Sequence, residues 1–125
     1  MASQWNGGIA VVDDEKDLTD LIARMLELSG IPVSFKAYDG PEAVKKLREC
    51  NPKPQVVIMD YRLPATTGVE VMKEMQRMDK GLKFIFLSAD SGAKDEAIQA
   101  GADLFLAKPT SMKGLVDAIY RVSGR

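Results

Sequence analysis

Residues 56–64 of the chain read VVIMDYRLP, so four apolar residues run directly into an aspartate, Asp60. An apolar run of this length is typical of a strand that is buried on both faces of a parallel sheet. A carboxylate at the edge of an apolar core is costly unless a partner compensates its charge. The sequence must therefore supply that partner elsewhere in the chain.

Four further apolar runs accompany this one, and segments with helical spacing lie between them. The runs cover residues 8–12, 32–37, 84–87 and 104–107. A strand–helix order repeated five times predicts an α/β fold: a five-stranded parallel sheet with helices on both faces and right-handed crossovers. We expect a single domain over residues 1–125, with its core at about 8–122.

The helical segments show one apolar face each. In the first, the apolar residues are spaced at i, i+3, i+4 and i+7, namely Leu18, Leu21, Ile22 and Met25. Asp39 with Glu42 three positions later predicts a capping box at the start of the second helix. Thr110 or Ser111 is the predicted N-cap of the last helix.

Polar residues follow the predicted strand ends. Asp13 and Asp14 follow the first strand, Asp60 the third, Ser88 the fourth and Lys108 the fifth. Ligands of open α/β sheets bind beyond the carboxyl ends of the strands, so these side chains are expected to meet. Three carboxylates in one partly buried site repel one another, and a divalent cation such as Mg²⁺ relieves that repulsion.

This set of residues suggests a reaction on phosphorus. One aspartate acts as the nucleophile and forms an acyl phosphate. The cation and the compact charge of Lys108 neutralise the transferring phosphoryl oxygens. Ser88 then donates a hydrogen bond to the new phosphoryl group.

Composition excludes several other functions. The 125 residues contain no histidine, which excludes Ser-His-Asp and Cys-His catalysis and His-ligated zinc. Any phosphoryl transfer that begins on a histidine must begin on another molecule. A net charge of -1 gives no sign of direct nucleic-acid binding. No apolar segment resembles a signal peptide or membrane span, so we expect a cytoplasmic protein that does not bind membranes.

The motifs together resemble the response-regulator receiver domain, the phosphoacceptor domain of two-component signalling. The resemblance covers residues 9–122 and rests on the following motifs in order: Asp13-Asp14, MDYRLP with Asp60, Gly68, Ser88-Ala89 and Lys108-Pro109. It implies the flavodoxin-like (βα)5 fold, and it implies that Asp60 is the phosphorylated residue. Asp14, Asp60 and the backbone carbonyl of Arg62 would bind Mg²⁺ or Mn²⁺, with Asp13 reaching the ion directly or through water.

The resemblance also assigns roles around the metal. Ser88 and Lys108 would contact the phosphoryl group, and the Lys108–Pro109 peptide bond is expected to be cis. Phosphorylation would draw Ser88 inward and let Phe105 rotate, which alters the surface of the fourth helix, fifth strand and fifth helix. Arg62 and Asp90 occupy the family's two modulating positions, and their opposite charges are predicted to pair across the site mouth and slow an attacking water.

The resulting functional hypothesis is a signalling domain rather than an enzyme. Asp60 would receive its phosphoryl group from a sensor histidine kinase or a histidine phosphotransfer protein, and the switched surface would bind a downstream protein or an output domain. The charges on the last elements favour a stand-alone or hybrid-kinase receiver over one that dimerises to bind DNA.

Three alternatives stand beside it. An aspartate-nucleophile phosphohydrolase of the haloacid-dehalogenase type needs a second Asp two residues after the nucleophile, where this chain has Arg62. A flavodoxin-like binding module needs a Gly-rich phosphate loop after the first strand, where this chain has DDEKD. A receiver-like scaffold that takes no phosphoryl group stays open.

Overall fold

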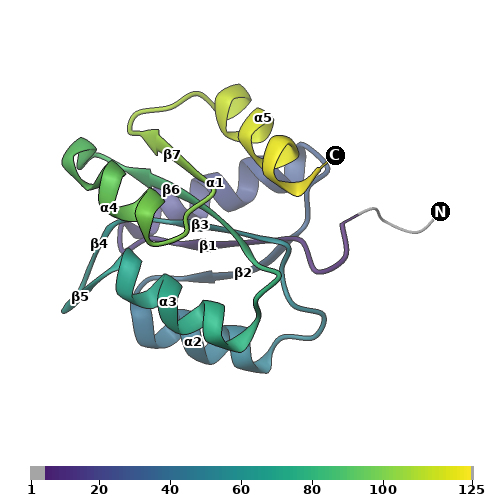
Figure 1. The fold of residues 1–125 in the computed structure, drawn as a ribbon. Helices are drawn as coiled ribbons and strands as arrows, with labels where there is room; N and C mark the ends of the chain where they lie inside the picture. The colour runs from purple at the N-terminus through teal and green to yellow at the C-terminus, as the bar shows by residue number, and fades with distance from the viewer. Residues whose placement is uncertain (1–4, 125) are drawn as a thin grey trace.

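The computed structural model describes residues 5–124, and a five-stranded parallel sheet forms its centre (Figure 1). The strands are β1 (Ile9–Val12), β2 (Val33–Ala37), β3 (Val56–Met59), β6 (Lys83–Ser88) and β7 (Leu104–Ala107). Their spatial order is β2-β1-β3-β6-β7, with every neighbouring pair parallel. The predicted five-stranded parallel sheet is confirmed, and the strand order reverses beside β1, where ligands bind in such sheets.

Helices cover both faces of this sheet. They are α1 (Lys16–Leu28), α2 (Gly40–Glu49), α3 (Gly68–Met78), α4 (Lys94–Gln99) and α5 (Met112–Ser123). Figure 1 shows α1 and α5 above the sheet and α2 and α3 below it, with α4 beside the left end. In the described residues, no helix combines the length and apolarity that crossing a bilayer requires.

The buried strand β3 shows why its sequence is apolar without interruption. All four of its side chains are buried. Val57 and Met59 pack with residues of α2 and α3, whereas Val56 and Ile58 pack with residues of α1 and α5. Both faces of β3 therefore contribute to a core, and each buried aliphatic side chain contributes about 1.5–3 kcal/mol.

Local capping sets the start of two helices as predicted. The Asp39 carboxylate accepts a hydrogen bond from the Glu42 N–H at 2.8 Å. Glu42 in return accepts from the Tyr38 N–H at 2.6 Å, one residue earlier than a standard capping box would have it. Ser111, rather than Thr110, caps α5 by accepting from the Gly114 N–H at 3.0 Å.

One hairpin and the bounds of three strands differ from the sequence expectation, and among these β2 begins at Val33 rather than at 32 and β6 covers Lys83–Ser88 rather than 84–87. Residues 61–67, where no strand was predicted, contain a hairpin of β4 (Arg62–Leu63) and β5 (Thr66–Thr67), whose two-residue strands are too short to give an alternating pattern. The first strand begins at Ile9 instead of Gly8, because Gly8 has a positive φ of 79°. That residues 1–125 make up one whole domain stays a prediction, since residues 1–4 and 125 lie outside the described range.

Candidate functional site

The carboxyl ends of the strands surround a hollow of about 620 Å³. Residues from the ends of β1, β3, β6 and β7 line it, together with the β4 segment; among them are Asp14, Glu15, Asp60, Arg62, Ser88, Asp90 and Lys108. The residues that meet here come from distant parts of the sequence; Lys108, for example, bonds Asp13, ninety-five positions earlier. The structure therefore brings together the side chains that the strand-end pattern had selected.

Asp60 is held at the floor of this hollow by its backbone. It is 7% exposed, and its N–H donates a hydrogen bond to the Val12 carbonyl at 3.0 Å. Gly68 packs directly against the same residue: a Cβ at that position would lie 2.2 Å from the Asp60 carbonyl oxygen. A glycine is therefore required there, and Asp60 is fixed before any ligand arrives.

Lys108 supplies the charge that compensates Asp60. Its ammonium group bonds Glu15 at 2.8 Å, Asp13 at 2.9 Å and Asp60 at 3.3 Å. The side chain of Lys108 is only 13% exposed, and those of Asp13 and Asp60 are 5% and 9% exposed, so these two ion pairs are shielded, whereas Glu15 is exposed. The Lys108–Pro109 peptide bond is cis, as the resemblance implied.

The electrostatics of the site follow from three carboxylates around one ammonium. Burial by itself lowers the pKa of Lys108, but the bonds from Glu15 and Asp13 outweigh it and raise that pKa well above its ordinary value of 10.5. Burial raises the pKa of Asp13 above its ordinary value of 3.8, and the neighbouring Asp60 charge adds to the rise. Lys108 is therefore charged, and the site keeps a net negative charge that favours a cation.

The carboxylates that converge are those of Asp13, Glu15 and Asp60. One oxygen from each lies within 4.8 Å of the others, which is a spacing that a metal ion could bridge. Hard carboxylate oxygens are the ligands that Mg²⁺ and Mn²⁺ prefer, so the residues present fit such an ion. Asp14 is exposed and lines the hollow outside this trio, and its role as a ligand stays a prediction.

Sequence reasoning did not select Glu15. The only available signal was a third acid after Asp13-Asp14, and one more acid at a helix start is ordinarily explained by the helix dipole. Whether Glu15 points into the site depends on where the β7 end places Lys108. That placement is a tertiary contact spanning 93 positions, which no local pattern reveals.

The remaining predicted residues surround the mouth of the site. Ser88 is buried, and its hydroxyl oxygen accepts a hydrogen bond from the Asp90 N–H at 3.1 Å. The predicted pair of Arg62 and Asp90 is present, with 2.7 Å between the guanidinium and the carboxylate. Phe105 is half-buried and packs against the core on the α2–α3 side.

One contact beside the site was not anticipated. The Tyr61 hydroxyl donates a hydrogen bond to the Glu96 carboxylate on α4 at 2.7 Å. The Arg62 guanidinium lies 5.9 Å from the centre of the Tyr61 ring, within the range of a cation–π contact. The residue that follows Asp60 is therefore linked directly to α4.

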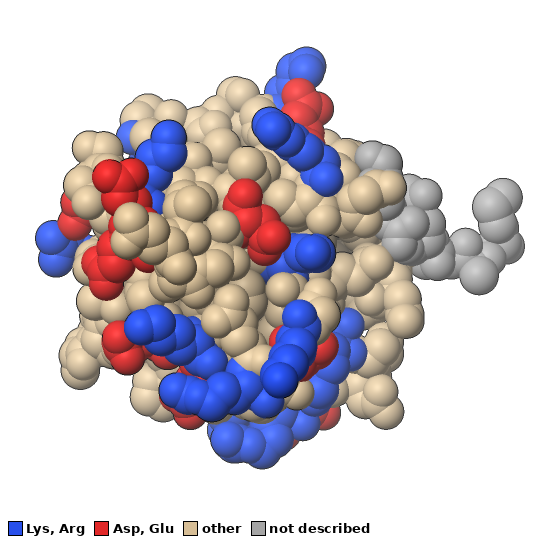
Figure 2. Space-filling model, viewed as in Figure 1, with Lys and Arg blue, Asp and Glu red and all other residues tan. Residues whose placement is uncertain are grey.

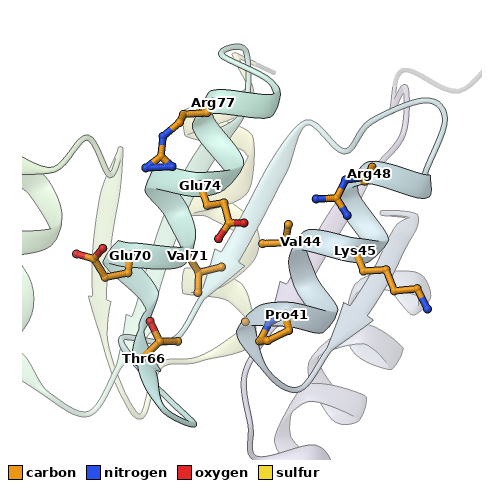
Figure 3. A pocket seen from close by; sticks show the side chains of 10 residues that line it. Pro41, Val44, Lys45, Arg48, Thr66, Glu70, Val71, Glu74 and Arg77 are labelled. Atoms are coloured by element: carbon orange, nitrogen blue, oxygen red, sulfur yellow. The ribbon is translucent and has the colours of Figure 1, made fainter.

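A second hollow lies between α2 and α3, away from the strand ends (Figure 3). Figure 2 shows Lys and Arg gathered over this part of the molecule, with acidic side chains among them. Val44 and Val71 form its apolar floor, while Arg48 and Glu74 extend toward each other from the two helices (Figure 3). Three basic and two acidic residues line this hollow, namely Lys45, Arg48, Arg77, Glu70 and Glu74, so its charge is of mixed sign and we place the chemistry at the strand ends.

Comparison with known proteins agrees with this placement. The family model described as the response regulator receiver domain matches residues 9–120. The chain belongs to the response regulator receiver domain family. This confirms the resemblance drawn from Asp13-Asp14, Asp60, Ser88 and Lys108, and with it a role in two-component signalling.

Relatives of known name include single-domain and longer regulators. The chain is 33% identical to chemotaxis protein CheY of Thermotoga maritima over 117 residues, which cover 92% of this chain and 96% of CheY. It is 36% identical to transcriptional regulatory protein PrrA of Mycobacterium tuberculosis and 33% identical to PhoB of Escherichia coli. The match to PrrA covers 86% of this chain and 46% of PrrA, and the match to PhoB covers 94% of this chain and 52% of PhoB. The chain therefore spans about half the length of these two regulators.

Solved structures give the same result for the fold. The response regulator TrrA of Thermotoga maritima, solved with Mg²⁺ and a beryllium fluoride, matches with a TM-score of 0.81 and 30% identity. That match covers 91% of this chain and 96% of TrrA. A Francisella receiver domain matches with a TM-score of 0.81 and 28% identity over 94% of this chain and 96% of that one. These are signalling proteins, and nothing in the comparisons supports the haloacid-dehalogenase alternative.

Proposed function

We propose that Asp60 accepts a phosphoryl group from a phosphohistidine of a partner protein. A carboxylate oxygen of Asp60 attacks phosphorus while the phosphorus–nitrogen bond breaks, and the departing imidazole keeps the bonding electrons and takes up a proton. The observation that carries the proposal is the position of Asp60: a rigid carboxylate at a strand end, 3.3 Å from the Lys108 ammonium, at the floor of an open hollow.

A divalent cation is part of this proposal. Asp13 and Asp60 would hold Mg²⁺ or Mn²⁺, together with Asp14 and the backbone carbonyl of Arg62. When bound, such an ion supplies positive charge to the phosphoryl oxygens. The net negative charge of the carboxylates around Lys108 supports this assignment, and TrrA is a related protein whose structure contains Mg²⁺.

The other residues have separate tasks. Lys108 would bond a phosphoryl oxygen and Ser88 would donate its hydroxyl proton to another. Ser88 now accepts from the Asp90 N–H, so its own proton is free to turn toward Asp60. Inward movement of Ser88 would let Phe105, half-buried on β7, rotate inward and change the face made by α4, β7 and α5.

The partners follow from the family. Receiver domains and CheY-type proteins interact with histidine kinases and with downstream targets. We propose that this chain takes its phosphoryl group from a sensor histidine kinase or a histidine phosphotransfer protein in the cytoplasm. Its switched α4–β7–α5 face then binds a downstream protein or output domain, and the chain itself turns over no substrate.

Intact-mass measurement with a small phosphodonor tests the central claim. With Mg²⁺ present, the wild-type protein should gain the mass of one phosphoryl group, and Asp60→Asn should gain none. Omitting Mg²⁺ should greatly slow the gain. An adduct that persists in Asp60→Asn would place the chemistry elsewhere, and a wild-type protein that never gains mass would favour the scaffold alternative.

A further inference from the structure

Glu15 occupies the N-cap position of α1, but its side chain does not cap the helix. Ser, Thr, Asp and Asn are the residues that stabilise this position, because their short side chains reach the first free N–H groups. The Glu15 carboxylate instead bonds the Lys108 ammonium at 2.8 Å. Glu15 therefore departs from the residue preference of the N-cap position and bonds a residue far away in the sequence, which indicates a tertiary role for its side chain.

The backbone of Glu15 is fixed in place for that bond. Its N–H donates to one carboxylate oxygen of Asp13 at 3.0 Å. Its carbonyl oxygen accepts from the buried Thr19 hydroxyl at 2.9 Å. The other oxygen of Asp13 bonds Lys108. The backbone of Glu15 is therefore held beside Asp13 at the β1–α1 junction, while its side chain is 61% exposed and reaches Lys108 from the solvent side.

The three contacts of Lys108 are unequal. The two short ones, 2.8 Å and 2.9 Å, go to Glu15 and Asp13 on the α1 side of the site. The longest, 3.3 Å, goes to Asp60 on β3. An ammonium group has three protons, enough to bond all three carboxylates, so its position reflects the balance of their attractions. It lies closer to the two carboxylates on the α1 side than to Asp60.

We propose that Glu15 is a positioning residue that restrains the Lys108 ammonium toward α1 and so leaves the Asp60 carboxylate accessible to a cation and to phosphorus. The proposal rests on phosphorylation of Asp60. Without the Glu15 charge, the carboxylate partners of Lys108 within residues 5–124 are Asp13 and Asp60, and the ammonium moves toward Asp60. The site also loses one negative charge, and both changes weaken cation binding.

Glu15→Gln is the test variant and Asp17→Asn is its matched control. Asp17 is an exposed acid in the first turn of the same helix, and the carboxylate partners of Lys108 within residues 5–124 do not include it. Both variants remove one negative charge at the start of α1. Calorimetric titration with Mg²⁺ should show the Kd raised about three- to tenfold in Glu15→Gln and less than about twofold in Asp17→Asn.

The position of the ammonium is measured separately, without metal or phosphodonor. The ¹⁵Nζ signal of Lys108 should shift in Glu15→Gln and stay in place in Asp17→Asn, and Glu15→Asp should recover part of the shift. Equal changes in Kd for the two variants, or an unmoved Lys108 signal in Glu15→Gln, would overturn the proposal. A wild-type protein that takes no phosphoryl group would refute the proposed function instead, and the Lys108 signal would still test the restraint.

Discussion

The Arg62 guanidinium and the Asp90 carboxylate form a 2.7 Å ion pair across the mouth of the site that contains Asp60. Arg62 is on β4, two residues after Asp60, and Asp90 lies two residues after Ser88, the last residue of β6. The pair therefore connects the segments that follow β3 and β6 beside Asp60. Its side chains are 77% and 27% exposed, so it contributes little to folding.

Replacing both residues, Arg62→Ala with Asp90→Ala, should speed dephosphorylation of the phosphorylated protein. We expect an increase of up to about tenfold, which corresponds to about 1.4 kcal/mol of barrier. The unfolding free energy should change by less than about 1 kcal/mol, as is usual for exposed pairs. Loss of the phosphoryl mass with time measures the first quantity, and urea denaturation measures the second.

The exposed pair of Lys113 and Asp117 on α5 has the same nitrogen–oxygen distance of 2.7 Å and provides a control outside the residues that line the site. Replacing both of its residues by alanine should leave the dephosphorylation rate unchanged. An unchanged rate in the Arg62 and Asp90 variant as well would show that the ion pair does not protect the phosphoryl group.

Asp13→Asn should stabilise the fold at neutral pH. Burial raises the pKa of Asp13 in the folded state, so its ionised form opposes folding. That cost is fully present above the raised pKa and disappears as the pH falls through it toward 3.8. Thermal melts without metal should therefore show a higher Tm for the variant at neutral pH, with the gain shrinking in acid. A gain that stays constant with pH would contradict this account.

Gly68→Ala should disturb Asp60 through its backbone. The added Cβ would lie 2.2 Å from the Asp60 carbonyl oxygen and 2.8 Å from the Met59 side chain. Overpacking of this kind costs about 1–3 kcal/mol, and relief requires the β3 end to move. Denaturant unfolding should show that loss together with slower phosphorylation. Gly81→Ala, whose nearest contact would be the Asp79 side chain at 3.3 Å, should show neither effect.

Tyr61→Phe should loosen α4 without stopping phosphorylation. The variant keeps the ring under Arg62 and removes only the hydroxyl that bonds Glu96. Amide hydrogen exchange in residues 94–99 should become faster, because an exposed hydrogen bond of this kind contributes about 0.5–1.5 kcal/mol to holding the helix. Unaltered exchange there would show that α4 is held by Ala97 and its core contacts alone.

Much of the fold was predictable because its signals are local. The apolar run at residues 56–59 indicated a strand buried on two faces, and both cores indeed contact it. The capping pair at Asp39 and Glu42 marked a helix start correctly. The hairpin of β4 and β5 gave no such signal, because strands of two residues show no periodicity. A turn at Ala65, which has a φ of 62°, brings these two strands together.

The candidate site was likewise predictable in part. Strand ends converge in any parallel sheet of this order, so the meeting of Asp13, Asp60, Ser88 and Lys108 followed from the sequence once the strands were recognised. The separation of tasks between Asp14 and Glu15 did not follow. Adjacent acids in one loop look alike in sequence, and only the backbone path decides which side chain faces inward.

The sequence by itself determined which segments form strands, where helices begin and which charged residues follow the strands. These features depend on periodicity and on contacts between near neighbours. The tertiary structure decided how the charges are shared. Lys108 reaches Glu15, Asp13 and Asp60 at three different distances because the ends of β1, β3 and β7 fix four side chains around one small volume. Such a balance depends on distances of a few tenths of an ångström between residues far apart in the chain, and packing alone sets them.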